Sequence, residues 1–275
     1  MMLDENAWER NTHYITQAYR TRLRYDSLMM DEHAGQLAPL RVRILGVPVD
    51  DVTLTDALQR VAGWLEDGGR SLHQVVTVNP EIVIASLRDE AYYETLLKAD
   101  LATPDGIGTI IASRLLGAPL RERVTGVDLV EAIARELRGT ARIFLLGAAP
   151  GVAERAGRRL QDQFPGTTIA GAWSGSPRDE DADAIFTQLR AVTPNVLLVA
   201  FGAPAQDRWI DQHRARLAAC GIVVAIGVGG TFDYLAEAVP RAPRIVRAAG
   251  FEWLYRLVRQ PGRWQRELAL PLFVA

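Results

Sequence analysis

From Arg41 onward, short apolar runs alternate with stretches in which apolar residues recur at helical spacing. The short runs are rich in β-branched residues and bounded by turn residues, so each is predicted to be a β-strand. Residues 196–200 and 222–226 are apolar almost throughout, as is typical of strands covered on both faces. Because helical stretches separate most runs, the pattern predicts an α/β fold with a mostly parallel sheet and helices on both faces. The predicted strands are residues 42–46, 74–77, 101–103, 142–147, 168–172, 195–201 and 222–228.

Two helices carry clear start signals. Residues 53–56 (TLTD) form a capping-box pattern, and Asn79-Pro80-Glu81 combines an N-cap residue, a proline at the first helical position and an acid in the first turn. In a parallel sheet, ligands bind beyond the carboxyl ends of the strands. The loops that follow residues 77, 103, 146, 201 and 226 are therefore where binding residues are expected.

Charge and composition divide the chain into three parts. Residues 1–39 are a polar extension of mixed charge for which no structure is predicted, residues 40–240 form the α/β core, and residues 241–275 form a basic appendage. The segment 240–275 holds seven arginines against two glutamates, a net charge of +5. Since the whole chain carries -2, the remainder carries -7. A cationic tail on an anionic body predicts an acidic partner: nucleic acid, a diphosphate or anionic lipid.

The composition also bears on the compartment. There is one cysteine, Cys220, and no cluster of cysteine and histidine at metal-binding spacing, which favours a reducing compartment and argues against a structural zinc site. Acids at positions 4, 5 and 9 lie where a signal peptide would be apolar, and no run reaches the roughly 18 apolar residues of a membrane span. The prediction is a cytoplasmic protein.

Two segments partly match known binding motifs, one for a dinucleotide and one for a metal ion. Residues 147–151 (GAAPG) lie between a strand and a helix but lack the G-x-G-x-x-G register, so they are interpreted as a tight turn and not as a dinucleotide site. Residues 179–181 (DED) offer spaced carboxylates for a metal, but acids are also favoured at the start of a predicted helix, and that interpretation is preferred.

The strand-end loops hold a polar set suited to a polyhydroxylated, phosphorylated substrate. Asp105 is the candidate general base, although a carboxylate there could equally be a turn or N-cap residue. The glycine-rich segment 227–230 could surround a phosphate with backbone N–H groups, or could merely permit close packing. The other members are the hydroxyl of Thr77, the amides of Asn79 and Gln206, and the cation Arg123.

In combination, six motifs resemble the WecG/TagA/CpsF family, glycosyltransferase family 26. The resemblance runs from about Arg41 to Arg266, and its motifs are residues 77–81 (TVNPE), 104–108 (PDGIG), 123–129 (RVTGVDL), 201–206 (FGAPAQ), 227–233 (GVGGTFD) and 252–256 (EWLYR). It implies a Rossmann-like domain with a C-terminal appendage, and an inverting, metal-independent transferase without cofactors. Three features depart from the family pattern, which usually has lysine at Ala205, glutamate at Asp207 and an aromatic pair after the glycine of residues 173–177 (WSGSP).

The resemblance implies a reaction and a set of roles. A sugar passes from a UDP-sugar to a sugar linked to undecaprenyl diphosphate, at the inner face of the bacterial membrane, for a surface polymer such as teichoic acid or exopolysaccharide. The donor sugar is N-acetylmannosamine, its uronic acid or glucose. Asp105 becomes the general base, with Thr77 as a second catalytic residue. Substrate binding is assigned to Asn79, Arg123, Gln206, Gly229, Gly230, Asp233, Arg256, Arg263 and Arg266.

The appendage interleaves aromatic and basic residues, for example Trp264 between Arg263 and Arg266, which suits a membrane interface. We therefore expect peripheral attachment to the inner leaflet of the cell membrane; an ordinary amphipathic helix packed on the domain is the alternative. Nucleic acid is not expected as a partner because the body is acidic and no recognition motif is present. A nucleotide-sugar epimerase and a non-catalytic membrane scaffold are rival functions, and homo-oligomerisation stays open.

Overall fold

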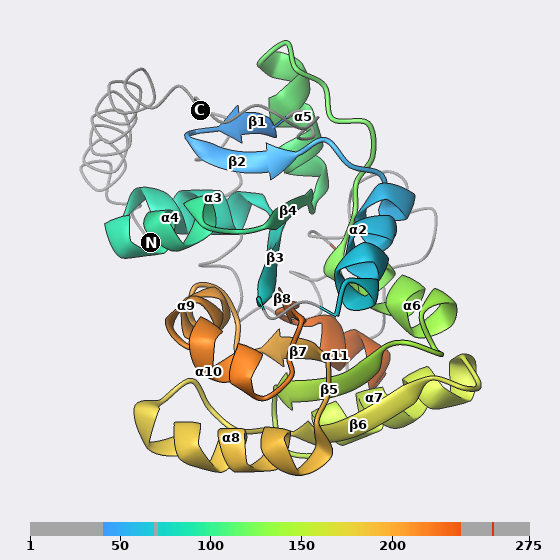
Figure 1. Cartoon of the computed structure of the whole chain (residues 1–275). Helices are drawn as coiled ribbons and strands as arrows, with labels where there is room; N and C mark the ends of the chain where they lie inside the picture. Colours follow the sequence, from blue (N-terminus) through green and yellow to red (C-terminus); the bar gives the residue numbers. More distant parts are fainter. Residues whose placement is uncertain (1–40, 69–70, 238–254, 256–275) are drawn as a thin grey trace.

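The computed structural model describes residues 41–68 and 71–237 together with Tyr255. Within these residues a six-stranded parallel sheet has the strand order β4-β3-β8-β7-β5-β6 (Figure 1). The α/β prediction is thus confirmed, whereas the extension at residues 1–39 and all of the basic appendage except Tyr255 lie outside the described residues. The strands are β3 (His73–Val78), β4 (Leu101–Pro104), β5 (Arg142–Gly147), β6 (Thr168–Trp173), β7 (Val196–Ala200) and β8 (Val224–Gly227).

Helices cover both faces of the sheet because alternate side chains of each strand point to opposite sides. On β7, Val196 and Leu198 join one buried cluster with α2, α6, α7 and α11, and Leu197 and Val199 join another with α8, α9 and α10. A third cluster unites β3 and β4 with α3, α4 and α5. The helices are α2 (Leu54–Glu66), α3 (Pro80–Leu87), α4 (Glu90–Leu97), α5 (Ile107–Leu115), α6 (Gly126–Glu136), α7 (Val152–Gln163), α8 (Asp179–Val192), α9 (Ala205–Gln212), α10 (Arg214–Ala219) and α11 (Thr231–Leu235).

The first predicted strand differs from the structure. Residues 42–46 were expected to be one strand, but β1 (Arg41–Ile44) ends where Leu45 and Gly46 take φ angles of 49° and 86° and turn the chain into β2 (Val47–Asp50). The two strands pair antiparallel outside the main sheet. Pro48 masks the second strand in the sequence because proline lacks the N–H donor that strands use.

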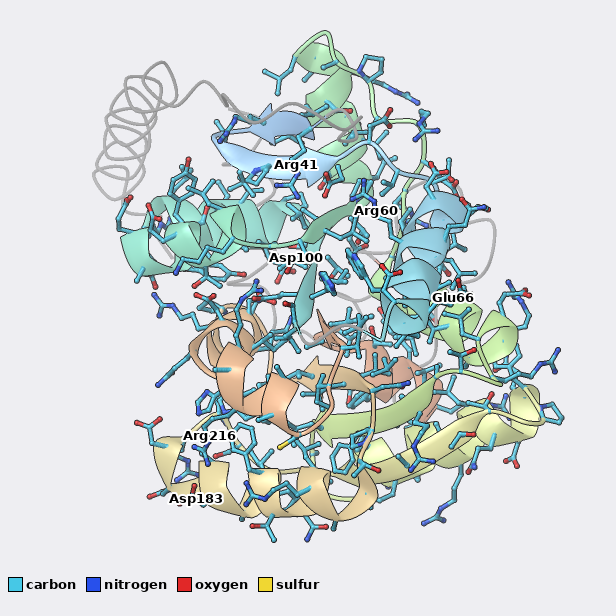
Figure 2. The ribbon with its side chains drawn as sticks, in the orientation of Figure 1. Arg41, Arg60, Glu66, Asp100, Asp183 and Arg216 are labelled. Atoms are coloured by element: carbon cyan, nitrogen blue, oxygen red, sulfur yellow. The ribbon has the colours of Figure 1, made fainter. Side chains whose placement is uncertain are left out.

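A buried carboxylate attaches this hairpin to the sheet. Asp50 is fully buried and accepts hydrogen bonds from Arg41 Nε at 2.8 Å and from the backbone N–H of Ala102, on the edge strand β4, at 2.7 Å. At the opposite end of the molecule, Arg216 on α10 reaches Asp183 on α8 at 2.7 Å (Figure 2). The Asp50 carboxylate is buried and the Asp183 carboxylate is exposed, so removing a partner of Asp50 should destabilise the fold more than removing Arg216.

The predicted helix starts are confirmed. The Thr53 hydroxyl accepts from Asp56 N at 3.1 Å, and the Asp56 carboxylate accepts from Thr53 N at 3.0 Å, which completes the capping box of α2. The Asn79 side chain accepts from Ile82 N at 3.0 Å and caps α3. Both helices therefore begin at the residues that the sequence indicates.

Candidate active site

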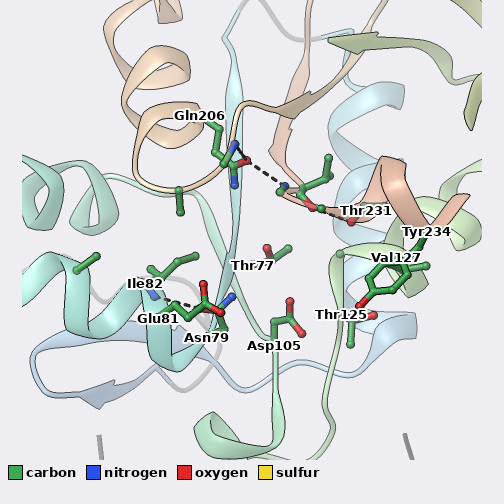
Figure 3. Close-up of a pocket in the computed structure, with 17 residues that line it drawn as sticks. Thr77, Asn79, Glu81, Ile82, Asp105, Thr125, Val127, Gln206, Thr231 and Tyr234 are labelled. Carbon is green, nitrogen blue, oxygen red and sulfur yellow. Dashed lines mark hydrogen bonds between the residues drawn. The ribbon is translucent and has the colours of Figure 1, made fainter. Parts of the chain in front are cut away.

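A pocket lies beyond the carboxyl ends of β4, β3, β8 and β7, which are four adjacent strands of the sheet (Figure 3). This is where parallel α/β sheets bind ligands. Six predicted residues line it: Thr77, Asn79, Asp105, Gln206, Gly229 and Gly230. They come from the ends of four strands or from the segments that follow them, so only the folded sheet brings them together.

Asp105 is held in the pocket by its backbone. Its N–H donates to Val78 O at 2.8 Å, and its carbonyl accepts from the Thr109 hydroxyl at 2.8 Å. Gly106 has a φ of 80°, and a Cβ built there would lie 3.6 Å from Pro80 Cδ, so the loops after β3 and β4 run close together. The carboxylate is half-buried and projects into the pocket (Figure 3). Two backbone hydrogen bonds therefore hold this part of the loop without using the Asp105 carboxylate.

Two other predicted residues use part of their hydrogen-bonding capacity within the protein. The Thr77 hydroxyl donates to Gly227 O at 3.2 Å and so joins β3 to the end of β8. The side-chain oxygen of Asn79 caps α3, which leaves its NH₂ group to face the pocket (Figure 3). Asn79 is thus an N-cap and a pocket residue at once, and its donor is the part that remains for a substrate.

Gln206 connects two of the loops. Its side-chain oxygen accepts from Gly202 N at 3.2 Å and from Gly229 N at 2.9 Å, so one amide fixes the loops after β7 and β8 (Figure 3). The side chain is only 2% exposed. Gln206 therefore shapes the pocket wall as well as lining it.

The glycine-rich segment is less open to phosphate than its sequence indicates. Gly229 N donates to Gln206, Val228 N donates to Val199 O, and Thr231 N donates to Val228 O. The helix that follows, α11, has only five residues. A phosphate cradle built from successive backbone N–H groups is thus largely occupied by internal hydrogen bonds, although Gly229 and Gly230 do line the pocket.

A buried carboxylate lies directly behind Gln206. Asp207 is fully buried, and its Oδ2 accepts from the Tyr92 hydroxyl at 2.7 Å. Its Oδ1 has no hydrogen-bond partner among the described residues. Burial raises the pKa of Asp207 to about 7, while the Tyr92 hydroxyl and the Gln206 amide act in the opposite direction. Burial also raises the pKa of Tyr92, so this hydroxyl keeps its proton and donates.

We predict that Gly227→Ala loosens the pocket wall. A Cβ at Gly227 would lie 2.8 Å from Gln206 Nε2 and closer still to Asp207 Oδ1, and both side chains are held by hydrogen bonds. The expected cost is about 1–3 kcal/mol of unfolding free energy. Gly63→Ala on α2 is the matched control, because no atom lies within 4 Å and alanine should stabilise the helix by about 0.5–1 kcal/mol. Denaturant titration measures both; equal stabilities would contradict the prediction.

Not all predicted residues reach the pocket. Arg123 lies on the loop before α6 and Asp233 in the first turn of α11, and neither lines it. Arg256, Arg263 and Arg266 lie outside the described residues. Among the further residues that line the pocket, four have polar or charged side chains to which the sequence analysis gave no role in the site: Glu81, Thr125 and Thr231, which lie inside quoted motifs, and Tyr234, which directly follows one.

Within residues 41–68 and 71–237, no three histidine, cysteine or acidic side chains are grouped so as to hold a metal ion. Among the helices that the structure describes, none has the length and apolar character needed to cross a bilayer.

Comparison with known proteins gives a consistent result. The model of the "Glycosyl transferase WecG/TagA/CpsF family" matches residues 42–275. A protein of Bacillus spizizenii strain W23 is 36% identical over 201 residues, which are 73% of this chain and 76% of that protein. A protein of Staphylococcus aureus strain MW2 is 30% identical over 235 residues, 85% of this chain and 91% of its own length. Both are named N-acetylglucosaminyldiphosphoundecaprenol N-acetyl-beta-D-mannosaminyltransferase.

Proposed function

The chain belongs to the WecG/TagA/CpsF glycosyltransferase family, and from this premise we propose that it transfers N-acetylmannosamine from UDP to N-acetylglucosamine on undecaprenyl diphosphate. The names of the relatives support the transferred sugar and the acceptor. The observation that carries the proposal within this chain is the position of Asp105, a pocket carboxylate at the carboxyl edge of the sheet among hydroxyl and amide groups. Such a lining suits a sugar better than an apolar ligand.

The proposed reaction is a single displacement. The Asp105 carboxylate takes the proton from an acceptor hydroxyl as that oxygen bonds to the anomeric carbon of the donor. The bond between the anomeric carbon and the UDP oxygen breaks, and UDP leaves with the electron pair. Attack from the side opposite the leaving group inverts the anomeric configuration. In this proposal the NH₂ group of Asn79, which lines the same pocket, donates a hydrogen bond to a sugar hydroxyl beside Asp105.

The leaving diphosphate needs positive charge. We propose that Arg256, Arg263 and Arg266 of the basic appendage supply it, since a guanidinium group keeps its charge and matches two phosphate oxygens at once. These arginines would then stabilise the negative charge of the leaving diphosphate, as a divalent metal ion does in other transferases. The same appendage, with its net charge of +5 in residues 240–275, would hold the protein weakly on anionic lipid, where each basic residue contributes about 1 kcal/mol.

The test is UDP release from the full-length protein. We expect release only when both UDP-N-acetylmannosamine and a short-chain polyprenyl-diphosphate N-acetylglucosamine are present, and no loss of rate in EDTA. Parallel assays with the uronic acid and with UDP-glucose identify the donor, and NMR of the product gives its anomeric configuration. Release without acceptor, a retained configuration, or activity that EDTA removes and Mn²⁺ restores would each contradict a stated part of the proposal.

A further inference from the structure

Exposed large hydrophobic side chains gather at one place on the core. In the part of the chain that the structure describes, the three such residues are Ile111, Leu115 and Leu116, which are 43%, 75% and 53% exposed. Ile111 and Leu115 are four residues apart on α5 and share one face of the helix, and Leu116 follows at its C-cap. Single exposed leucines are ordinary, but three within six residues indicate a contact surface. We call these three residues the α5 patch.

The rest of α5 is firmly packed. Ile110 and Ser113 are buried, and the Ser113 hydroxyl donates to Ile110 O at 2.8 Å and accepts from Leu120 N at 3.1 Å. The helix lies beside the β1–β2 hairpin at the end of the molecule opposite α8 (Figure 1). The α5 patch therefore stands on a fixed helix, and its exposure does not arise from a loose loop.

The segment that carries the patch is basic. From residue 106 to residue 121 the chain contains two arginines, Arg114 and Arg121, and no acidic residue. Arg121 is engaged by Asp51 and Asp56. Arg114 is exposed and lies three residues from Ile111, on the same side of the helix as the patch. Apolar side chains next to a cation match the boundary between the headgroups and acyl chains of an anionic bilayer.

The patch also lies at a suitable distance from the catalytic loop. Helix α5 begins two residues after Asp105, and its rise of about 1.5 Å per residue places Leu115 about 12 Å beyond Ile107. A hexose joined to a diphosphate has a comparable length. The patch is thus one short helix away from the loop of Asp105, where the acceptor sugar is proposed to bind.

We propose that the α5 patch enters the surface of an anionic lipid bilayer and holds the mouth of the pocket against the membrane that carries the acceptor. The partner is the bilayer itself, because the cation and the proximity to an acceptor that ends in a lipid favour lipid over a second copy of the chain. This inference rests on the proposed function for its purpose, but the contact with lipid can be measured without any activity.

The first experiment uses the single cysteine of the chain, Cys220, which is 7% exposed and so reacts poorly. Leu115→Cys is labelled with a polarity-sensitive fluorophore in the full-length protein, and Gln188→Cys on the exposed side of α8 is the matched control. With phosphatidylglycerol vesicles we expect a blue shift, and quenching by brominated lipid, at position 115 only. Equal signals at both positions would overturn the proposal. So would apolar surroundings before vesicles are added, or a shift that follows protein concentration instead of lipid.

The second experiment measures transfer. Leu115→Glu/Leu116→Glu is compared with Gln188→Glu/Ala191→Glu, which adds the same charge to α8. On a long-chain acceptor in phosphatidylglycerol vesicles we expect a loss of about tenfold or more for the α5 variant alone. On a short, soluble acceptor both should stay within about twofold of the unmodified protein. An equal loss on both acceptors, or none, would overturn the proposal. Failure of the unmodified protein on both acceptors would count against the proposed function, and the fluorophore result would still decide the lipid contact.

Discussion

Asp105→Asn is expected to lower turnover about 100- to 10,000-fold while the protein stays folded, because asparagine cannot take the acceptor proton in the displacement step. The loop around Asp105 is held by backbone groups, through Val78 O and the Thr109 hydroxyl. Asparagine keeps these contacts and nearly the same shape. The loss should therefore appear in kcat, with KM for the donor little changed. Initial rates of UDP release measure both, and thermal unfolding verifies the fold.

Glu81→Gln provides the matched control. Glu81 lines the same pocket from the first turn of α3, so this variant removes an equal charge from the same cavity without touching the proposed base. We expect it to cost much less activity than Asp105→Asn. If the two losses were equal, a general effect of pocket charge would explain them, and if Glu81→Gln were the more damaging, Glu81 would replace Asp105 as the base.

Much of the architecture can be predicted from local patterns. Seven strand segments are predicted, and six of them are the strands of the parallel sheet. The clearest are β7 and β8, which are buried throughout and therefore apolar throughout. Helix starts at Thr53 and Asn79 depend on residues three positions apart, so the sequence displays them directly. The hairpin was missed because its turn depends on positive φ angles at Leu45 and Gly46, and leucine gives no sign of one.

The sequence predicts many of the residues that line the pocket, but not the hydrogen bonds that these residues make with one another. Motifs at strand ends identify Asp105, Asn79 and Gln206, since the fold brings all strand ends to one edge. They do not show that the side-chain oxygen of Gln206 accepts a hydrogen bond from Gly229 N, because these two residues are 23 positions apart. Arg123 is predicted to bind substrate because it opens a motif, but its side chain does not line the pocket. Partners that are distant in sequence leave no local pattern.

The buried pair of Asp207 and Tyr92, which joins residues 115 positions apart, is another such contact, and it predicts a pH dependence. In the unfolded chain the Asp207 carboxyl has a pKa near 3.8, and in the folded protein burial raises its pKa to about 7. Between these values the folded state retains a proton that the unfolded state has released. Raising the pH therefore favours unfolding, with the full stability contribution present below about pH 4 and lost above about pH 7. The difference is on the order of 4 kcal/mol.

Asp207→Asn should remove this dependence, because asparagine does not titrate. The difference in unfolding free energy between the variant and the unmodified protein, from denaturant titrations at pH 4 to 8, is expected to shift in favour of the variant as the pH rises through the pKa of Asp207. Tyr92→Phe removes a hydrogen bond that favours the charged carboxylate, so the pKa of Asp207 should rise further and its titration should move to higher pH. A difference between Asp207→Asn and the unmodified protein that stays constant across this range would mean that Asp207 is already charged at low pH, and that a partner other than Tyr92 compensates its burial.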